Sequence, residues 1–337
     1  MRFLTFLIVV AFAIVAGCAA DGADSKTPAD RWLRLVQTIR LDGVEGRIDH
    51  FALDEKGHRL FMAALGNDSV EVIDAVAGKV VGQIKGLQAP QGVAFAPEAN
   101  RIAVANDKDG SCRIFDGTSL KQVGNVDLKD DADNVRYDAG GGVFWVGYGD
   151  GGLAAIDVAK GVQIKDIKVE GHPESFQLEQ KGKRIFVNVP RPGHVAVVDR
   201  EKGTVIDKWP LKVAQSNFPM ALDEENHRLF VGCRKPAKMV VIDTISGKEI
   251  AGVDCVGDTD DLFYDLTNKR IYVVGGEGAV DVIEQSDADH YRRVACVKTA
   301  PGARTAWIAA AEGRLFVAVP HRGGQNAELR VFEARKD

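Results

Sequence analysis

The chain has 337 residues, of which 45% are hydrophobic and 27% are charged, a composition typical of a globular protein. Its formal net charge of −5 at pH 7 provides no basic surface for phosphate groups, so nothing in the composition favours DNA or RNA as a partner. A chain of this length usually forms two domains unless it is built from repeats, so internal repeats decide the domain count.

The first 17 residues have the pattern of an export signal. Arg2 supplies a positive start, and residues 3–15 form an apolar stretch that is shorter than the about 20 residues of a membrane-spanning helix. The stretch ends in Val-Ala-Gly-Cys at 15–18, which resembles a bacterial lipobox. That resemblance implies a signal peptide over residues 1–17 and lipidation of Cys18. The alternative is a soluble secreted protein that is cut at a nearby small residue.

The residues that follow extend this interpretation. Ala19 stands where lipoproteins kept at the inner membrane typically carry aspartate, so we expect a protein on the periplasmic side of the cell envelope, anchored to the outer membrane rather than the inner one. Residues 18–31 are small and polar without an apolar period, which predicts a flexible tether. An oxidising compartment permits disulfides, but the spacing of the remaining cysteines matches no metal motif; they are Cys112, Cys233, Cys255 and Cys296.

A pattern of three short apolar strands recurs from residue 46 onward. The second strand of the successive copies starts at Arg59, Arg101, Val143, Arg184, Arg228, Arg270 and Arg314. The third strand ends on an acid, at Asp74, Asp116, Asp157, Asp199, Asp243, Glu284 and Glu333. Seven copies at steps of 41 to 44 residues predict an all-β fold, a seven-bladed β-propeller in which residues 32–333 form a single domain.

One end of the repeat array lacks a strand, and the other end has an extra strand. The last copy has strands at 305–309, 314–319 and 328–332 but no fourth strand, and residues 33–39 form a strand that has no blade of its own. We therefore expect the N-terminal strand to complete the last blade, which leaves no open sheet edge. An open β-solenoid, the competing fold, would not need this complementarity.

Two copies of the repeat carry a family resemblance. The sequences RIFVN at 184–188 and RIAVAN at 101–106 resemble the repeats of the YVTN (YncE-like) β-propeller proteins of bacteria. The resemblance covers the whole repeat domain and implies the propeller fold. It implies no particular activity, because many members of that family are exported proteins without established chemistry.

Polar residues that recur from blade to blade are assigned to the fold. One group lies where the first strand enters its turn, at Asp54, Asp138, Glu179, Asp223 and Asp265. A second group ends the third strands, from Asp74 to Asp243. Carboxylates at such positions accept hydrogen bonds from the backbone N–H groups of the turn that follows, so we expect both groups to be structural.

The positions just before each first strand behave differently, because they change from copy to copy and yet are almost all polar. The innermost strand of a propeller blade starts beside the central channel, so these residues should form a ring at the channel mouth, joined by the loops between second and third strands. The predicted ligand-binding residues are Arg47, Asp49, His50, Gln91, Asp133, Asn134, His172, Glu174, Asn217, Asp260, Asp261, Arg304 and His321. The alternative is a solvated rim of scattered ion pairs, each of which contributes little.

One hypothesis for this ring is a metal site. The candidate metal ligands are Asp49, Asp133, Glu174 and Asp260. Carboxylates suit Ca²⁺, Mg²⁺ or Mn²⁺, and a contribution from His50 or His172 would favour Zn²⁺. The arrangement is similar to that of the gluconolactonase–regucalcin propellers, which implies a divalent-metal-dependent hydrolase of lactonase or esterase type. His50 or Asp261 would then be the general base.

The other hypothesis, which the sequence favours, is a binding or scaffolding module. Its mouth would hold a small anionic ligand or a partner protein through arginines, and the candidates are Arg47, Arg234, Arg304 and Arg322. The chain has no serine nucleophile elbow, haem-attachment CxxCH, glycine-rich phosphate loop or HExxH motif, which excludes several classes of enzyme. A quinone-dependent redox propeller is also disfavoured, because that class normally has eight blades.

Overall fold

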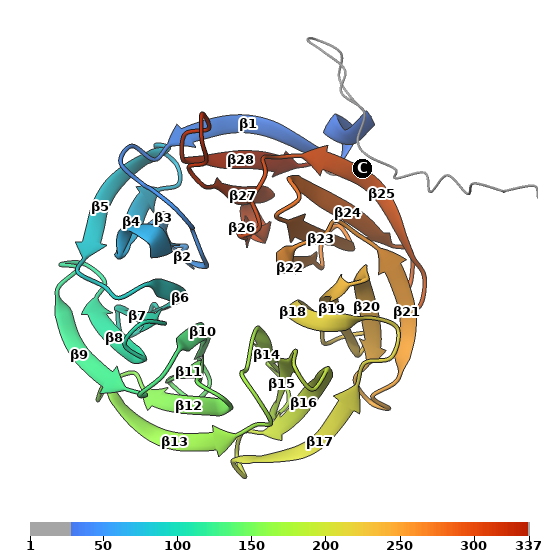
Figure 1. The fold of residues 1–337 in the computed structure, drawn as a ribbon, viewed down its shortest axis with the longest axis horizontal. Helices are drawn as coiled ribbons and strands as arrows, with labels where there is room; N and C mark the ends of the chain where they lie inside the picture. Colours follow the sequence, from blue (N-terminus) through green and yellow to red (C-terminus); the bar gives the residue numbers. More distant parts are fainter. Residues whose placement is uncertain (1–27, 336–337) are drawn as a thin grey trace, which may run out of the picture.

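The computed structural model describes residues 28–335, which form seven four-stranded antiparallel sheets arranged in a ring around a central channel (Figure 1). The predicted all-β, seven-bladed propeller is therefore confirmed. The predicted signal peptide (residues 1–17) and the lipidation site at Cys18 lie outside the described residues. Of the predicted tether at 18–31, the structure describes the last four residues, which form the 3-10 helix η1 (Pro28–Arg31).

The first four blades follow one another along the chain, each with its strands in sequence order from the channel outward. Blade 1 contains β2 (Phe51–Asp54), β3 (Arg59–Ala64), β4 (Ser69–Asp74) and β5 (Lys79–Lys85), with the 3-10 helix η2 (Leu65–Asn67) between β3 and β4. Blade 2 contains β6 (Pro90–Ala96), β7 (Arg101–Asn106), β8 (Ser111–Asp116) and β9 (Gln122–Asp127). Blade 3 contains β10 (Ala132–Asp138), β11 (Val143–Tyr148), β12 (Gly152–Asp157) and β13 (Val162–Lys168). Blade 4 contains β14 (Phe176–Leu178), β15 (Arg184–Val189), β16 (His194–Asp199) and β17 (Thr204–Pro210).

The remaining blades repeat this order until the last, which draws its outermost strand from the other end of the chain. Blade 5 contains β18 (Gln215–Asp223), β19 (Arg228–Lys235), β20 (Ala237–Asp243) and β21 (Glu249–Asp254). Blade 6 contains β22 (Thr259–Asp265), β23 (Arg270–Gly275), β24 (Ala279–Gln285) and β25 (Tyr291–Lys298). Blade 7 contains β26 (Ala306–Ala309), β27 (Arg314–Val319), β28 (Glu328–Ala334) and β1 (Leu33–Arg40), with the 3-10 helix η3 (Ala310–Glu312) between β26 and β27.

The predicted closure of the ring by the N-terminal strand is present. Strand β1 pairs antiparallel with β28, and the register runs from Leu33 opposite Ala334 to Arg40 opposite Glu328. Two side chains of β1 face inward, because Leu33 is fully buried and Ile39 is 2% exposed. The hydrogen bonds between β1 and β28 thus join the two ends of the chain within one sheet, so no blade is left with three strands.

The hydrophobic core is divided among the blade interfaces. The described residues form seven clusters of buried apolar side chains, and each cluster contains residues of two neighbouring blades, including blade 7 with blade 1. The middle strands are therefore covered on both faces, and their sequences are nearly continuous apolar runs. In β15, every residue after Arg184 is buried. One blade could not bury both of its faces alone, so the blades stabilise one another around the ring.

The recurring acids have the structural role that was predicted for them. Asp116 accepts hydrogen bonds from the backbone N–H groups of Thr118 (3.2 Å) and Ser119 (2.9 Å). The equivalent acids of blades 1, 3, 4 and 5 accept the same pair of turn bonds; they are Asp74, Asp157, Asp199 and Asp243. At the other turn, Asp54 accepts from the Gly57 N–H at 2.9 Å. These carboxylates hold the hairpins that join the strands of each blade.

We expect the turn acids to make the fold more stable at neutral than at acid pH. The hydrogen bonds from Ser119 lower the pKa of Asp116 below its ordinary value, so its stabilising effect is complete above the pKa of the unfolded chain and is lost as pH falls through the lower folded value. In thermal unfolding followed by circular dichroism, Asp116→Asn should lower the midpoint by about 1–2 °C at pH 7. The difference from the wild type should vanish towards pH 3, and a constant difference at all pH values would contradict this explanation.

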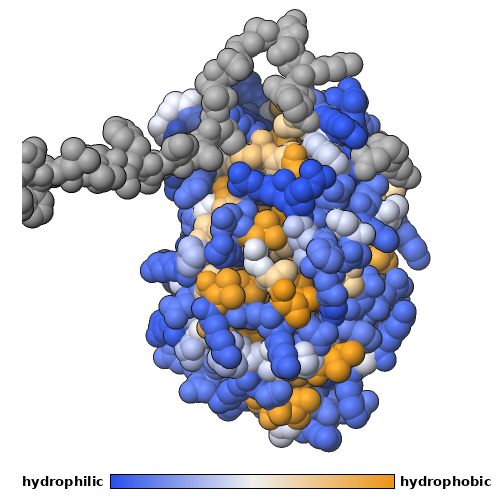
Figure 2. Space-filling model, turned by 90° about the vertical axis from the view of Figure 1, so that its right-hand side faces the viewer, coloured by the Kyte–Doolittle hydropathy of each residue, from blue (hydrophilic) through white to orange (hydrophobic). Residues whose placement is uncertain are grey.

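The surface carries hydrophobic side chains in small separate groups. On the side shown in Figure 2, hydrophilic residues cover most of the face and hydrophobic ones lie between them. The largest exposed fraction among the large apolar side chains of residues 28–335 is 72%, at Ile245 in a turn. Isolated apolar residues of this kind are common on protein surfaces and mark no interface by themselves. In the same residues, no helix has the length and apolarity needed to cross a membrane.

The cysteines of the described chain are free thiols that form no disulfide with one another. Cys112, Cys233 and Cys255 are buried, and burial raises the pKa of each thiol to about 12. A thiol that stays protonated is a poor nucleophile and metal ligand, so these three cysteines serve as small apolar packing residues.

Candidate functional site

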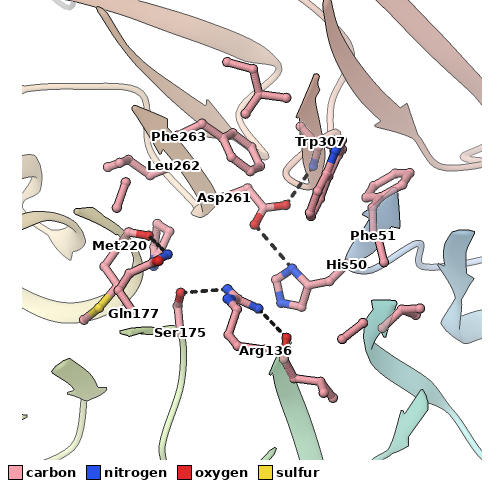
Figure 3. A pocket seen from close by; sticks show the side chains of 18 of the residues that line it. His50, Phe51, Arg136, Ser175, Gln177, Met220, Asp261, Leu262, Phe263 and Trp307 are labelled. Carbon is pink, nitrogen blue, oxygen red and sulfur yellow. Dashed lines mark hydrogen bonds and ion pairs between the residues drawn. The ribbon is translucent and has the colours of Figure 1, made fainter. Parts of the chain in front are cut away.

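Two cavities lie one above the other along the propeller axis. The mouth cavity has a volume of about 500 Å³ and is lined by Arg47, Gln91, Asp107, Asp130, Asp131, Asp133, Gly149, Asp150, His172, Glu174, Pro190, Arg191, Phe218, Arg234, Asp260 and Arg304. The channel cavity has a volume of about 410 Å³ and is lined by the innermost strands of all seven blades (Figure 3). Consecutive residues such as Asp260 and Asp261 line one cavity each, so the two cavities meet where the innermost strands begin.

Bulges at the beginning of four innermost strands direct these side chains. The register with the next strand shifts between Pro90 and Val93, Ala132 and Val135, Asn217 and Met220, and Thr259 and Asp261. A bulge leaves an extra residue outside the regular ladder and turns its side chain away from the sheet face. In blade 3 the bulged pair is Asp133 and Asn134, and in blade 6 it includes Asp260. The polar residues of the predicted ring therefore turn towards the axis while the strand below keeps its packing.

Most of the predicted ring residues meet at these cavities. Of the predicted residues, the mouth cavity is lined by Arg47, Gln91, Asp133, His172, Glu174, Asp260 and Arg304. The channel cavity is lined by His50 and Asp261. Asp49 and Asn134 are buried between the two cavities, in contact with His50. The loops between second and third strands reach the mouth as predicted, through Asp107, Gly149, Asp150 and Arg191, and Arg234 reaches it from the end of β19.

Two predicted residues lie elsewhere. Asn217 is fully buried between blades, where its Nδ2 donates hydrogen bonds to Asn188 Oδ1 (2.8 Å) and to the carbonyl oxygen of His194 (3.0 Å). His321 lies on the outer loop of blade 7, and its Nδ1 is 2.5 Å from Glu45 Oε2. Neither lines the mouth or the channel cavity: Asn217 satisfies buried amide and backbone groups, and His321 is paired with Glu45.

One side of the mouth is built from arginines around Asp260. Arg234 Nη2 donates to Asp260 Oδ1 at 2.6 Å, and Arg47 Nη2 lies 3.7 Å and Arg304 Nε 4.0 Å from Asp260 Oδ2. Burial raises the pKa of Asp260, and the arginines oppose that rise. The guanidinium of Arg234 also stacks on Phe218, with its Cζ 3.6 Å from the ring centroid. These arginines are therefore already engaged with carboxylates of the same chain.

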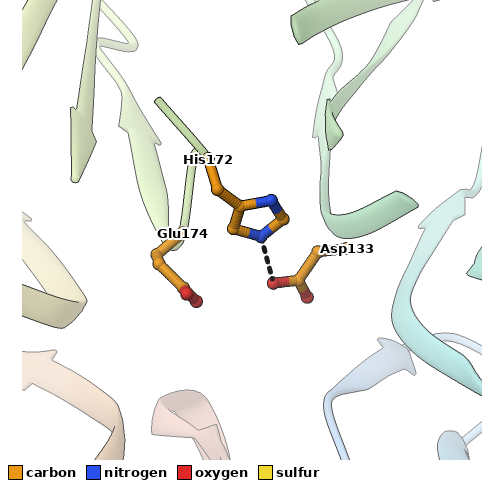
Figure 4. Close-up of side chains that lie close together, drawn as sticks. All are labelled: Asp133, His172 and Glu174. Atoms are coloured by element: carbon orange, nitrogen blue, oxygen red, sulfur yellow. Dashed lines mark ion pairs between the residues drawn. The ribbon is translucent and has the colours of Figure 1, made fainter. Parts of the chain in front are cut away.

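The opposite side of the mouth carries an excess of acids. His172 Nε2 lies 3.6 Å from Asp133 Oδ2 (Figure 4). His172 Nδ1 lies 3.5 Å from Asp131 Oδ2. Burial raises the pKa of Glu174 to about 8, and the nearby Asp133 carboxylate adds to the rise. Burial on its own would lower the pKa of His172, but Asp133 and Asp131 together raise it to about 9. Asp131 is half-buried beside them, and the Gln91 amide donates to it at 3.2 Å.

A charged layer separates the mouth from the channel. His50 Nδ1 lies 3.3 Å from Asp261 Oδ1, and His50 Nε2 lies 3.5 Å from Asp49 Oδ1. Burial favours the neutral imidazole, but the two carboxylates outweigh it and raise the pKa of His50 to about 10. Burial raises the pKa of Asp49 to about 7 against the influence of His50 and Arg47. His50 is thus a cation held between two carboxylates.

The channel contains one charged residue that the sequence analysis missed, Arg136 of β10. Figure 3 shows its guanidinium below the axis near His50 and Ser175, with Phe263 and Trp307 across from it. At the equivalent position of the other innermost strands stand Ala52, Ala94, Gln177, Ala221, Phe263 and Trp307. Arg136 is the only charged residue among these seven equivalent positions, and this difference between blades is the signal in the sequence that identifies it.

Comparisons with known proteins give the fold of the chain and no closer relationship. No protein-family model matches it, and no curated protein does. Among solved structures, it is similar to a chain of the hydrazine synthase of Kuenenia stuttgartiensis, with 16% identity and a TM-score of 0.73 over 82% of this chain and 95% of that one. A chain of the mitotic checkpoint complex has 12% identity and a TM-score of 0.77 over 96% of this chain and 99% of that one. At these identities the likeness shows the fold alone, and the protein is identified by it as a seven-bladed β-propeller.

Proposed function

We propose that the protein is a binding module of the cell envelope that takes a small carboxylate-bearing molecule into its central channel. The observation that carries this proposal is Arg136, a guanidinium that faces the channel cavity without an ion-pair partner among residues 28–335. The wider role agrees with the propeller fold, which suits binding and scaffolding because rigid blades hold convergent side chains.

The contacts of Arg136 leave most of its hydrogen-bonding capacity free. Nη1 donates to the carbonyl oxygen of Val135 at 2.9 Å, and Nη2 donates to Ser175 Oγ at 3.2 Å. Both acceptors are neutral, and the aromatic ring of Phe176 lies 5.6 Å from Cζ. Burial lowers the pKa of Arg136, although Asp261 and Asp133 act against that effect from a longer distance. A guanidinium has five N–H donors in a planar fork that matches a carboxylate, so an incoming carboxylate would compensate this buried charge.

The walls of the channel favour an apolar body on the ligand. Leu53, Val93, Met220 and Leu262 line the cavity together with aromatic rings such as Trp307. The indole Nε1 of Trp307 is buried and has no hydrogen-bond partner among the described residues. A volume of about 410 Å³ falls within the range of small-molecule sites. We therefore expect an aromatic or branched aliphatic carboxylate rather than a sugar.

The sequence supports a location in the cell envelope for this proposed module. The export signal and the lipobox-like Cys18 support a lipid-anchored protein on the periplasmic side, with the outer membrane favoured. The repeats resemble those of the YVTN (YncE-like) propellers, which supports a place among exported bacterial propellers. A lipid tether would keep the binding module at the membrane surface, and an acyl chain on the cysteine detected by mass spectrometry would establish it.

The proposal is tested by calorimetric titration of phenylacetate, with phenylacetamide as the uncharged control. Arg136→Met should weaken phenylacetate binding about 10- to 100-fold, which corresponds to the about 1.5–3 kcal/mol of a hydrogen bond to a charged group. Arg136→Lys should bind phenylacetate with an affinity between those of the wild type and Arg136→Met, because lysine keeps the positive charge and loses the planar pair of N–H donors. Arg322→Gln serves as the matched control, since Arg322 is exposed and lines neither cavity. Equal affinity of wild type and Arg136→Met for a panel of such acids would refute the proposal.

The metal-dependent hydrolase remains a second candidate because of one observation. Asp133, His172 and Glu174 offer ligand atoms that lie within 4.8 Å of one another at the mouth. A metal ion there could polarise an ester or lactone carbonyl and activate water, as in other metal hydrolases. Acid release from gluconolactone or p-nitrophenyl acetate by metal-loaded protein would support this role, and the absence of turnover by protein with bound metal would exclude it for these substrates.

A further inference from the structure

The mouth cavity contains a group of three side chains whose geometry fits a metal ion. Asp133 comes from β10, and His172 and Glu174 come from the segment before β14 (Figure 4). One atom from each residue lies within 4.8 Å of the other two. Pro173 stands between His172 and Glu174, and the Glu174 backbone N–H donates to the carbonyl oxygen of Asn188 at 3.0 Å. The segment is thus held while both side chains face Asp133.

The orientation of His172 points to a ligand role. Its Nδ1 lies 2.8 Å from the carbonyl oxygen of Gly149, and a carbonyl can only accept, so Nδ1 carries a hydrogen. The other nitrogen, Nε2, is then directed at Asp133 and Glu174. Metal-binding histidines characteristically donate their second ring N–H to a backbone carbonyl, which fixes the ring and presents the remaining lone pair.

The Glu174 carboxylate offers independent support, because it lacks a hydrogen-bond donor. Glu174 has no side-chain hydrogen bond or ion pair within the described part of the chain, although it is largely shielded from solvent. Asp260 lines the same cavity, but Arg234 donates to its Oδ1, and Arg47 and Arg304 lie 3.7 and 4.0 Å from its Oδ2. Buried carboxylate oxygens are normally hydrogen-bonded or bound to a cation, so Glu174 indicates a positively charged ligand in this part of the mouth.

We infer that Asp133, His172 and Glu174 hold a divalent transition-metal ion of the zinc type, with a further coordination position facing the mouth cavity. One nitrogen and two carboxylate oxygens suit Zn²⁺ or Mn²⁺ better than Ca²⁺, which takes six to eight oxygens. Two atoms on one zinc ion lie at most about 4.2 Å apart, so a small rotation of Glu174, which has no partner to lose, would complete the set. Asp49 and Asp260 of the sequence-based metal hypothesis are paired with arginines instead.

The inference is independent of the carboxylate site, because Arg136 lines the other cavity. The test is a calorimetric titration of untagged, chelator-treated full-length protein with Zn²⁺, Mn²⁺ and Ca²⁺, in parallel with metal analysis after dialysis. We expect one equivalent of Zn²⁺, bound at least 10-fold more tightly than Ca²⁺. Substitution of Zn²⁺ by Co²⁺ should give visible absorption bands of a low-coordinate site, which a loosely attracted surface ion would not show.

Two variants and a matched control locate the ion. Glu174→Gln and His172→Ala should each weaken Zn²⁺ binding at least 10-fold, whereas Asp150→Asn should leave it unchanged, because Asp150 lines the same cavity outside the group with its side chain 86% exposed. Thermal unfolding of the metal-free variants verifies their folding, and Glu174→Gln keeps the test valid if His172→Ala misfolds. Absence of Zn²⁺ binding, or equal losses in Glu174→Gln and Asp150→Asn, would overturn the inference. Phenylacetate titration of the metal-free protein tests the carboxylate site at Arg136 separately, so failure of one proposal can be distinguished from failure of the other.

Discussion

A chain that lacks residues 28–40 is expected to lose about 10 °C or more of thermal stability and to aggregate. Those residues supply η1 and β1, the outermost strand of blade 7. Their loss exposes the apolar surface that Leu33 and Ile39 cover, which is worth about 3–6 kcal/mol for the two side chains. For a large domain, each kcal/mol corresponds to about 2–4 °C. The deletion also leaves β28 as an open edge, which is a template for pairing between molecules.

The deletion is compared with a chain that begins at residue 28, and both are followed by circular dichroism and light scattering. A synthetic peptide of residues 28–41 should bind the truncated chain and restore the transition, because an extended peptide can add a strand to an exposed sheet edge. The same melting temperature with and without β1 would show that the ring is held by the blade interfaces alone, and the closing strand would then have little energetic importance.

The second large effect is expected for Asp261→Ala, which should destabilise the fold by about 3–5 kcal/mol. The Asp261 carboxylate lies 3.3 Å from His50 Nδ1 and accepts a hydrogen bond from the Ala306 backbone N–H at 2.8 Å. Its removal leaves the buried imidazolium with Asp49 alone and leaves a buried N–H group without an acceptor. Chemical denaturation measures the loss, and the double variant His50→Gln/Asp261→Asn should lose less than the sum of the single variants, because both charges are removed together.

The effect of Asp261→Ala should also depend on pH. The pKa of His50 is raised from 6.5 to about 10, so the ion pair contributes fully below the pKa of the unfolded chain and its contribution is lost as pH rises to about 10. The difference between wild type and variant should therefore be largest near pH 6 and shrink at alkaline pH. A difference that grows towards pH 10 would show that His50 is neutral in the folded protein.

The fold could be predicted from the sequence because each blade repeats the same local pattern. Arg59, Arg228 and the other five positions that the period identified are the first residues of the second strands, from β3 to β27. The closing strand could be predicted from the same repeat, since the last copy lacks a fourth strand and an extra strand precedes the first copy. The period locates the strand starts because each strand must occupy the same place in every blade for neighbouring blades to pack on one another around the ring.

The candidate site could be predicted only in outline. The ring position of Asp133 and Glu174 followed from their place before a strand, but which acids come together depends on side-chain directions and ion pairs such as Arg47 with Asp49, which the sequence does not reveal. Arg136 lies inside a strand, where only a comparison of equivalent positions reveals it. Asn217 precedes the two positions of its blade that belong to the ring, Phe218 and Pro219, and it turns into the interface with Asn188, a contact that no spacing in the chain indicates.

The bulges at the start of the innermost strands have a consequence for how this protein can diversify. They present successive residues to the axis while the ladder below them continues unbroken from Val93, Val135, Met220 and Asp261. A substitution at Gln91, Phe218 or Asp260 of these bulges alters a side chain that lines the mouth, whereas a side chain at Gly92 would meet the backbone of blade 3. Each of these four blades is therefore an exchangeable element of a recognition surface, and mutational libraries confined to the mouth-lining residues of the bulges should yield folded proteins with new specificities.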